Sequence, residues 1–300
     1  MAVIITAAFI ATVVLFLERS GQRPDDDSGA RKSPGRETPE KATTGKTPGP
    51  ALKPAPAQTA YPGRPIAIII DDIGFDLKIA EELAGIPLPI AFAVLPHTPH
   101  AVEAARLLHA AGKEILLHLP MEPRSYPGES PGAGALMADM DEGEIRKRIR
   151  EDLAAVPFVS GVNNHMGSRF MEDEARLAIV MEELRKRDLF FVDSRTTADS
   201  RGRKSAGRAG VRFAARELFI DHTPGYAAAL KNLTGSFRQG RSNGKPVLMI
   251  GHPHAQTVRA IRDALPVWQL EGYRVIPVSA CFISGGVGKQ APLAKKQAER

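Results

Sequence analysis

Cysteine is almost absent from this 300-residue sequence, in which Cys281 is the only one. A single cysteine cannot form an internal disulfide, so the fold has to be stable without a covalent crosslink. No glycine-rich dinucleotide fingerprint follows the first apolar run, at residues 66–70. Its absence argues against a dinucleotide-binding sheet, because such a site needs glycines where the backbone approaches the pyrophosphate.

Aromatic residues are scarce as well, at 6% of the chain. The densest basic segment covers residues 201–216, and its only aromatic residue is Phe213. A nucleic-acid surface usually interleaves basic and aromatic side chains. We therefore predict no nucleic-acid partner, and we interpret residues 201–216 as a solvated loop.

Large apolar residues are missing from residues 20–63, where only Leu52 and Tyr61 interrupt polar and small side chains and eight prolines. Such a segment cannot bury enough surface to offset the entropy that is lost when it becomes ordered. We predict a disordered, proline-rich linker over residues 20–63, one folded domain over residues 64–284 and a flexible basic tail over residues 285–300.

Charged residues are absent from residues 2–17, which are followed by Glu18 and Arg19. At about 1.5 Å per residue, this run is slightly short for a hydrocarbon core of about 30 Å. It also lacks the basic start and the small-residue cleavage site of a signal peptide. We favour an uncleaved membrane anchor at residues 1–19 over a cleaved signal. Either one predicts a location in the cell envelope, anchored in the inner membrane or secreted to the periplasm.

The apolar run at residues 66–70 ends in two adjacent carboxylates, Asp71 and Asp72. An apolar run without alternation is typical of a strand that is buried on both faces of a parallel sheet. The aspartates would then lie at the carboxyl end of the strand, where α/β folds gather catalytic groups. Because adjacent carboxylates repel each other, the pair indicates a bound cation or a shared proton. Consecutive strand side chains point to opposite faces, so we expect the backbone to leave strand geometry near Asp72.

Strands and helices alternate along the chain from residue 66 to residue 278. This alternation predicts an α/β fold, a (β/α) barrel or a close variant. Asp139 and Glu142 form a candidate capping pair at the start of the third helix. The predicted strands cover residues 66–70, 90–95, 114–118, 158–162, 189–193, 218–221, 247–250 and 274–278, and the predicted helices cover residues 77–83, 101–111, 139–155, 172–187, 226–237 and 257–270.

Groups that bind metals or transfer protons follow most of the predicted strands. In a closed barrel the carboxyl ends of the strands meet at one mouth, so we expect these groups to converge. Carboxylate and imidazole ligands suit a divalent metal such as zinc, with positions left open for water and substrate. The pattern predicts a hydrolytic site. Besides the two aspartates, the groups are His118, the Asn-Asn-His-Met-Gly-Ser segment 163–168, Asp193, Asp221, His222, His252 and His254.

Four motifs at these strand ends resemble those of the divergent polysaccharide deacetylases. They are Ile-Asp-Asp-Ile-Gly at 70–74, His-Leu-Pro-Met-Glu at 118–122, the segment 163–168, and Ile-Gly-His-Pro-His at 250–254. The family is related to carbohydrate esterases that remove N- or O-acetyl groups from amino-sugar polymers. The resemblance implies an irregular barrel of seven or eight strands, a divalent metal such as Zn²⁺, and an envelope glycan such as peptidoglycan as the substrate.

The resemblance also implies roles for individual residues, with Asp71 as general base and Asp72 and His118 as metal ligands. The second histidine of the family's metal motif is missing, because position 122 is Glu122. Either Glu122 binds the metal through oxygen, or His165 reaches across from the next strand end. We favour His165, since a second nitrogen restores an Asp-His-His ligand set.

The motif after the seventh strand implies that His252 is the general acid, with Asp193 or His254 orienting groups around it. Several further residues are candidates for outer ligands or substrate contacts. They are Glu122, Asn164, Asp193, Arg195 and His254.

Two other functions are compatible with the same residues. The missing family ligand allows a non-catalytic module that binds glycans or assists envelope assembly. A metal phosphoesterase is disfavoured, because the motifs contain no glycine-rich phosphate cradle and no lysine.

Overall fold

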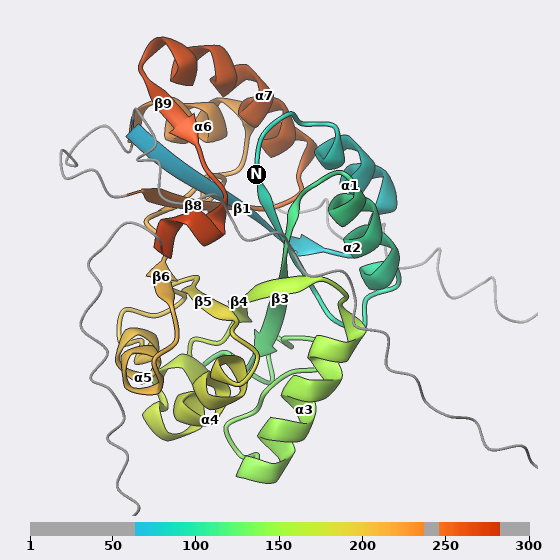
Figure 1. Ribbon diagram of the computed structural model, residues 1–300, viewed down its shortest axis with the longest axis vertical. Coiled ribbons are helices and arrows are strands. Elements are labelled where there is room, and N and C mark those ends of the chain that lie inside the picture. The colour runs from blue at the N-terminus through green and yellow to red at the C-terminus, as the bar shows by residue number, and fades with distance from the viewer. Residues whose placement is uncertain (1–63, 237–245, 283–300) are drawn as a thin grey trace, which may run out of the picture. The chain divides into compact units, whose positions relative to one another are not determined.

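The computed structural model describes residues 64–236 and 246–282 (Figure 1). The predicted anchor at 1–19, the linker at 20–63 and the tail at 285–300 lie outside these residues, so the domain boundaries remain predictions. Among the helices of the described ranges, none has the length and apolar character needed to cross a bilayer.

The strands form one parallel sheet in the order β6-β5-β4-β3-β2-β1-β8-β7, and β9 pairs with the start of β1. Strands β1 and β8 are far apart in the sequence but pair directly. This pairing places residues 66–70 beside residues 247–251. The strands are β1 (Arg64–Ile73), β2 (Ala91–Val94), β3 (Glu114–Met121), β4 (Val159–Met166), β5 (Phe190–Asp193), β6 (Phe213–Ala215), β7 (Leu218–Phe219), β8 (Val247–Gly251) and β9 (Tyr273–Val275).

The helices lie around the outside of the strands (Figure 1). They are α1 (Leu77–Ala84), α2 (Ala101–Ala110), α3 (Glu142–Ala155), α4 (Glu174–Arg185), α5 (Gly202–Ala209), α6 (Tyr226–Lys231) and α7 (Ala255–Leu270). Short turns of tighter or wider helix cover Phe170–Glu172, Asn232–Ser236 and Val278–Phe282. Strand and helix alternate as the sequence predicts, except that β7 follows β6 without a helix between them.

The sheet curls until only two residues, Arg216 and Glu217, separate its end strands β6 and β7. The backbone N–H of Arg216 donates to the carbonyl of Asp193 on β5 at 2.9 Å. The N–H of Glu217 donates to the carbonyl of Leu248 on β8, also at 2.9 Å. The two-residue link between β6 and β7 therefore forms backbone hydrogen bonds to β5 on one side of the gap and to β8 on the other. The predicted irregular (β/α) barrel is confirmed.

The apolar core has two layers because alternate strand residues face opposite ways. On β1, the side chains of Ile66, Ile68 and Ile70 pack in the larger cluster, which includes the helices. Ala67 and Ile69 belong to a smaller cluster built from strand residues and the C-terminal segment, inside the barrel. All five are completely buried, and each fully buried isoleucine contributes roughly 1.5–3 kcal/mol to stability.

The barrel interior is narrow, and glycine at one position makes room for a large ring. A Cβ atom at Gly161 on β4 would lie 2.2 Å from the ring of Phe190 on β5. The smaller cluster contains Phe190 together with small residues such as Ala91 and Ala93. Any side chain at position 161 would therefore displace the aromatic ring that fills the centre.

Two details of the sequence prediction are wrong. Helix α3 begins at Glu142 and is capped by Asp141 with Glu144, instead of by Asp139 with Glu142. The carboxylate of Asp141 accepts from the N–H of Glu144 at 2.8 Å, and the carboxylate of Glu144 accepts from the N–H of Asp141 at 2.8 Å. The capping pattern is present in the sequence, displaced by two residues.

The segment 201–216 is not the predicted solvated loop, because it contains α5 and β6. One face of α5 is buried through Ser205 and Ala206. Its basic side chains Lys204 and Arg208 pair with Glu174 on α4. Because the segment is rich in charged residues and glycine, its sequence pattern does not indicate the short amphipathic helix that it forms.

Candidate metal centre and active site

The predicted site residues lie on strand positions that continue the barrel interior. Asp71 follows Ile69 by two residues, His118 follows Leu116, and His252 follows Ile250. His165 is four residues beyond Gly161 on β4. Because side chains two residues apart share a strand face, these groups extend the interior towards the carboxyl mouth.

Asp72 would face away from the interior if β1 stayed regular. Its φ angle is 55°, and the register between β1 and β2 shifts between Ile70 and Ile73. Such a left-handed conformation costs on the order of 1–3 kcal/mol outside glycine, with aspartate among the better tolerated residues. The expected departure from strand geometry near Asp72 is confirmed, and it lets adjacent aspartates serve one site.

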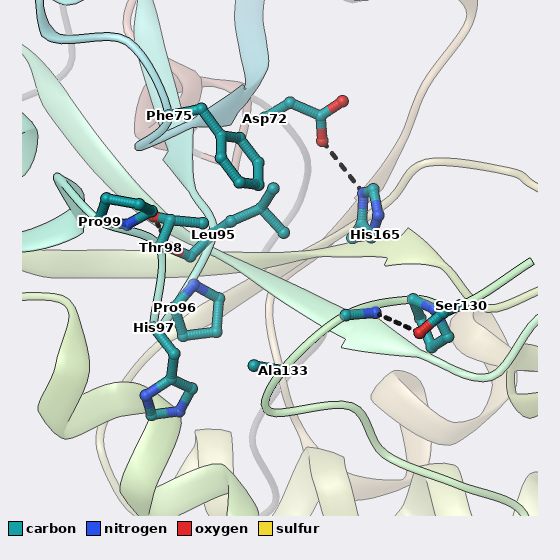
Figure 2. Close-up of a pocket in the computed structure, with 12 residues that line it drawn as sticks. Asp72, Phe75, Leu95, Pro96, His97, Thr98, Pro99, Ser130, Ala133 and His165 are labelled. Atoms are coloured by element: carbon teal, nitrogen blue, oxygen red, sulfur yellow. Dashed lines mark hydrogen bonds and ion pairs between the residues drawn. The ribbon is translucent and has the colours of Figure 1, made fainter. Parts of the chain in front are cut away.

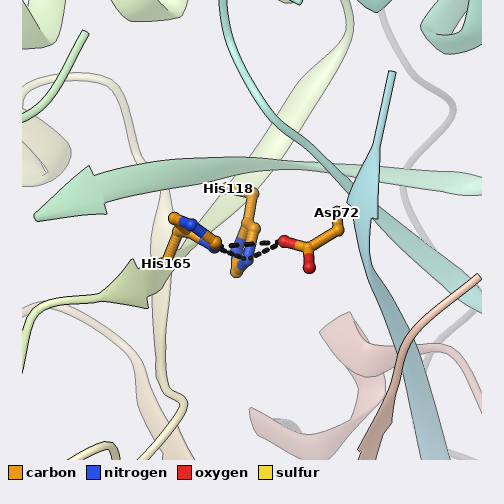
Figure 3. Close-up of side chains that lie close together, drawn as sticks. All are labelled: Asp72, His118 and His165. Atoms are coloured by element: carbon orange, nitrogen blue, oxygen red, sulfur yellow. Dashed lines mark hydrogen bonds and ion pairs between the residues drawn. The ribbon is translucent and has the colours of Figure 1, made fainter. Parts of the chain in front are cut away.

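Asp72, His118 and His165 meet as a compact triangle (Figure 3). Asp72 Oδ1 lies 3.2 Å from His118 Nε2 and 3.1 Å from His165 Nδ1, and the two nitrogens are 3.1 Å apart. Ligands at about 2.0 Å from a tetrahedral zinc ion are separated by about 3.3 Å. Asp72 Oδ1 is buried and has no hydrogen-bond partner in the described residues. The donor set and its spacing fit a divalent cation.

Asn163 fixes the ring of His118 and the carboxylate of Asp71 at the same time. His118 Nδ1 lies 2.9 Å from Asn163 Oδ1, which assigns a hydrogen to Nδ1 and makes Nε2 the nitrogen that faces the triangle. Asn163 Nδ2 donates to Asp71 Oδ1 at 2.7 Å. The sequence places Asn163 among the candidate groups of segment 163–168 but indicates no role for it, although strand alternation puts it on the same face as His165.

Replacing Asn163 with alanine is expected to lower metal affinity about 10- to 100-fold, because ligand orientation depends on such outer hydrogen bonds. The measurement is a zinc titration in competition with a chromophoric chelator. Asn164→Ala is the matched control, since Asn164 lies on the other face of β4. Equal losses of affinity in both variants would show that general destabilisation, and not ring orientation, is responsible.

Charges around the triangle shift the pKa values of its members. Burial alone would lower the pKa of His118, but the carboxylates of Asp71 and Asp72 raise it to about 9. Burial opposes ionisation of Asp72, yet the close imidazole rings of His118 and His165 hold its pKa far below the usual value. Burial raises the pKa of Asp71, whose Oδ2 lies 3.6 Å from His118 Nε2. The site therefore contains one strongly anionic carboxylate and one carboxylate that holds a proton more readily.

His252 is oriented by Asp221, which lies two residues after the end of β7. Asp221 Oδ1 lies 2.9 Å from His252 Nδ1, and its Oδ2 accepts from the N–H of His252 at 2.7 Å and from Thr257 Oγ1 at 2.9 Å. His252 Nε2 is thereby turned towards the triangle, 4.0 Å from Asp72 Oδ2. Burial would lower the pKa of His252, but Asp221 raises it.

This arrangement corrects the expected partners of His252, which were Asp193 or His254. Asp193 Oδ1 accepts from the N–H of Arg195 at 2.7 Å, and its Oδ2 accepts from Ser200 at 2.6 Å. It follows Phe191, which packs on the helix side, so it lies on the wrong face of β5. His254 is exposed, with its ring 6.0 Å from that of His252. With Asp221 and His252 it forms a second group of possible ligands, but the oxygens of Asp221 are already used.

The remaining candidate contacts are engaged elsewhere. Glu122 is buried, with Oε1 paired to Arg169 at 2.5 Å and Oε2 accepting from the N–H of Ala138 at 2.5 Å. Asn164 accepts from the N–H of Ser194 at 2.9 Å and donates to the carbonyl of Met166 at 2.8 Å. Both side chains therefore brace loops at the mouth. The side chain of Arg195 is exposed, on a residue with a φ of 53°.

A cavity of about 360 Å³ opens beside the triangle (Figure 2). Phe75, Leu95 and Pro96 lie along one side of it, and His165 and Ser130 lie along the other. Its size lies in the range of small-molecule sites, and its lining is mostly apolar near one polar end. A substrate seated here would place a polar group at the triangle and a less polar part against the ring of Phe75.

One wall of this cavity is braced from helix α3 by a buried carboxylate. His97 Nε2 lies 2.8 Å from Asp152 Oδ1, and Asp152 is completely buried. Figure 2 shows the His97 ring turned away from Asp72. A Cβ atom at Gly134 would lie 2.4 Å from Asp152 Oδ1, so the backbone at Gly134 also comes close to this carboxylate. Burial, opposed by the hydrogen bond from His97, raises the pKa of Asp152 to about 7.

This pKa predicts that stability falls as pH rises from about 4 to about 7, because the folded chain keeps a proton that the unfolded chain has released. The linked free energy is at most about 4 kcal/mol, at about 1.4 kcal/mol per pKa unit. Asp152→Asn should therefore gain melting temperature relative to wild type as pH rises through this window. Thermal unfolding at pH 4, 6 and 8 checks it. Glu151→Gln, an exposed neighbour on α3, is the control, and a pH-independent difference for Asp152→Asn would contradict the assignment.

Comparison with known proteins gives a family and a fold. Residues 68–282 match the family model described as divergent polysaccharide deacetylase. The uncharacterised protein YibQ of Escherichia coli is 35% identical over 199 residues, which are 66% of this chain and 61% of YibQ. An uncharacterised protein of Haemophilus influenzae is 31% identical over 200 residues, which are 67% of this chain and 70% of that protein. The match thus spans less than two thirds of YibQ.

A solved structure shows the same fold. It belongs to an uncharacterised protein of Agrobacterium tumefaciens and superposes with a TM-score of 0.70. The sequence identity is 24%, and the superposition covers 74% of this chain and 91% of that chain. At this identity, the likeness concerns the path of the backbone.

Proposed function

Because the chain belongs to the divergent polysaccharide deacetylase family, we propose that it is a metal-dependent hydrolase that removes acetyl or similar acyl groups from a cell-envelope polysaccharide or amino sugar. The observation that carries the proposal is the triangle of Asp72, His118 and His165, with Asp71 and His252 beside it. A hydrolase of this kind needs a cation site, a base and an acid, and these five side chains supply all three.

Asp72, His118 and His165 would hold the cation, and two nitrogens with one oxygen suit Zn²⁺. When bound, the cation would polarise the substrate carbonyl and make a water molecule more acidic. Asn163 keeps His118 in the required tautomer through its 2.9 Å contact with Nδ1. The remaining chemistry falls to side chains that do not belong to the triangle.

Asp71 is placed to take a proton from the attacking water. Its Oδ1 is held by Asn163, while Oδ2 faces His118 Nε2 at 3.6 Å. A raised pKa makes Asp71 a better base than an exposed aspartate. As the water oxygen bonds to the carbonyl carbon, its proton passes to Asp71.

His252 is placed to protonate the leaving group. Its Nδ1 is fixed by Asp221 at 2.9 Å, so a proton on Nε2 points towards the triangle. Because Asp221 raises the pKa of His252, the ring holds a proton more readily than an unperturbed histidine does. When the bond between carbonyl carbon and nitrogen or oxygen breaks, the departing sugar amine or hydroxyl takes this proton and the acyl group leaves as a carboxylic acid.

The direct test measures acetate release by the purified full-length chain. N-acetylglucosamine oligomers are incubated with zinc-loaded protein, with protein stripped by a chelator, and with stripped protein to which zinc is returned. We expect release that disappears with the metal and recovers with it. Binding of zinc without any release from amide or ester substrates would overturn the hydrolase assignment.

A second candidate function is a glycan-binding or envelope-assembly module without turnover. The observation in its favour is Glu122, which stands at the position of a missing family ligand and is bound to Arg169. Such a module would bind the same oligomers after metal removal and in Asp71→Asn. The hydrolase requires the metal for release, so the two functions separate in one experiment.

The cellular location belongs to the same proposal. Residues 1–19 would tether the domain to the inner membrane or direct it to the periplasm, and residues 20–63 would let it reach a glycan. An envelope glycan as substrate supports this arrangement, because the domain has to meet its polymer outside the cytoplasm. Fractionation of cells that express the full-length chain tests it, with recovery in the cytosol as the contrary result.

A further inference from the structure

Arg216, in the two-residue link between β6 and β7, has a guanidinium group that the proposed reaction does not use. Its Nε donates to the carbonyl of Ser194 at 2.7 Å, and its Nη2 donates to the carbonyl of Arg195 at 3.1 Å. The group lies over the ring of Phe219, with Cζ 3.6 Å from the ring centre. Two carbonyls and one aromatic face therefore fix the orientation of this charge.

The contacts of Arg216 lead to both proton-transfer groups of the site. Ser194 Oγ lies 3.4 Å from Asn163 Nδ2, the amide nitrogen that also holds the proposed base. The ring of Phe219 stacks with the ring of His252, and their centres are 5.8 Å apart. One residue thus connects Arg216 to the base side of the site, and one residue connects it to the acid.

The charge of Arg216 has no counterion in the part of the chain that the structure describes. Within residues 64–236 and 246–282, no carboxylate forms an ion pair with Arg216 or Arg195, and Nη1 of Arg216 has no hydrogen-bond partner. Burial lowers the pKa of Arg216, and the nearby charge of Arg195 lowers it further, while Asp193 and Asp71 act in the opposite direction. Arginine stays protonated even so, and a half-buried cation of this kind favours a bound anion.

Arg216 also lies across the barrel mouth from the cavity beside the triangle. The residues that line this cavity belong to strands β1 to β4 or follow them, whereas Arg216 follows β6. In the curled sheet, the gap between β6 and β7 is opposite the middle of the β1 to β4 series. A ligand centred on the triangle therefore meets an apolar wall on one side and an unpaired cation on the other.

From this geometry we propose that Arg216 and Arg195 bind an anionic group of the substrate, a carboxylate or phosphate on the sugar that carries the acyl group. Nη1 of Arg216 donates to the anion, and the exposed side chain of Arg195 adds a second positive charge. Hydrogen bonds between charged partners are stronger than those between neutral ones. The substrate class is then an acidic amino sugar. This inference rests on the proposed function for the identity of the reaction site, but anion binding is measured separately from turnover.

The test measures binding to the zinc-loaded, full-length chain by calorimetry. The ligands are N-acetylglucosamine, N-acetylglucosamine 6-phosphate, N-acetylmuramic acid and the methyl ester of N-acetylmuramic acid, which keeps the bulk of the acid without its charge. We expect one of the two acidic sugars to bind about 10- to 100-fold more tightly than its neutral counterpart, as hydrogen bonds to charged groups give. The acid that is preferred identifies the anion as carboxylate or phosphate.

Arg216→Gln should reduce this preference to about threefold or less, because the charged donor is lost. Arg212→Gln is the matched control and should keep the preference. Arg212 also lies over a ring, with Cζ 5.9 Å from the centre of Phe190, and donates to a backbone carbonyl, but it precedes β6 and so lies at the opposite end of the barrel. Since Arg216 also braces the β6–β7 link, Arg195→Gln gives a second variant at an exposed side chain, with an expected loss of preference of about threefold.

Equal affinity for acidic and neutral sugars in wild type would overturn the inference. A preference that survives in both Arg216→Gln and Arg195→Gln would also overturn it, because the anion would then be bound at the metal. Acetate release from the same sugars separates this inference from the proposed function. A preference that depends on Arg216, without release, supports the anion site and rejects the hydrolase, whereas release without any preference supports the hydrolase and rejects the anion site.

Discussion

Asp72→Ala is expected to abolish stoichiometric zinc binding, with a loss of at least about 1,000-fold in affinity. Asp72 Oδ1 contributes one corner of a triangle whose other corners are imidazole nitrogens 3.1 and 3.2 Å away. Removing it leaves two ligands, one fewer than the three protein ligands that zinc hydrolases use. Metal analysis after gel filtration and a chelator competition give the affinity.

Two further variants identify the third ligand. His165→Ala should lose zinc as Asp72→Ala does, because His165 Nδ1 lies within 3.1 Å of both other donor atoms. Glu122→Gln should keep zinc, since Glu122 is occupied by Arg169 and the N–H of Ala138. Zinc retained in His165→Ala and lost in Glu122→Gln would reverse the assignment and place Glu122 in the ligand set.

Asp71→Asn is expected to keep zinc and to lose acetate release by a factor of about 10² to 10⁴, the usual contribution of a general base. Asparagine has almost the same shape, and its oxygen can still accept from Asn163 Nδ2. It cannot take a proton from water, so only the rate of the chemical step should fall. Rates are measured under substrate saturation, on protein whose zinc content and melting temperature have been checked.

An exposed carboxylate supplies the control for Asp71→Asn. Asp188 is 88% exposed at its side chain, and Asp188→Asn should release acetate at the wild-type rate. Release by Asp71→Asn within threefold of wild type would mean that another group accepts the proton. His118 Nε2, at 3.6 Å from Asp71, would then have to be reconsidered as more than a ligand.

The sequence is informative about this site because strand ends and strand alternation are both readable from it. The run of apolar residues before Asp71 predicts a buried strand, and the conflict between Asp71 and its neighbour predicts the irregular backbone at Asp72 that the structure shows. The same alternation, applied to β4 and β5, separates Asn163 from Asn164 and turns Asp193 away from the interior. Those two outcomes follow from counting residues along a strand.

Other features depend on contacts between distant parts of the chain. Glu122 and Arg169 are 47 residues apart, and their ion pair exists only because β3 and β4 lie side by side. Asp221, just after β7, reaches His252, just after β8, in the same way, because β7 and β8 pair. Local sequence patterns contain no signal for either pair. Helix α5 was missed for a different reason, since its short apolar face is outnumbered by basic residues that find partners on α4.

The two-residue link through Arg216 and Glu217 also has a consequence for association between chains. The unpaired N–H and C=O groups of a long terminal strand can template another strand, which leads to aggregation or domain swapping. Here the terminal strands β6 and β7 have three and two residues, and the link between them bonds to β5 and β8. A second chain finds almost no free strand edge there to extend. Curling the sheet until its end strands nearly meet therefore also protects the folded domain from adding strands of its neighbours.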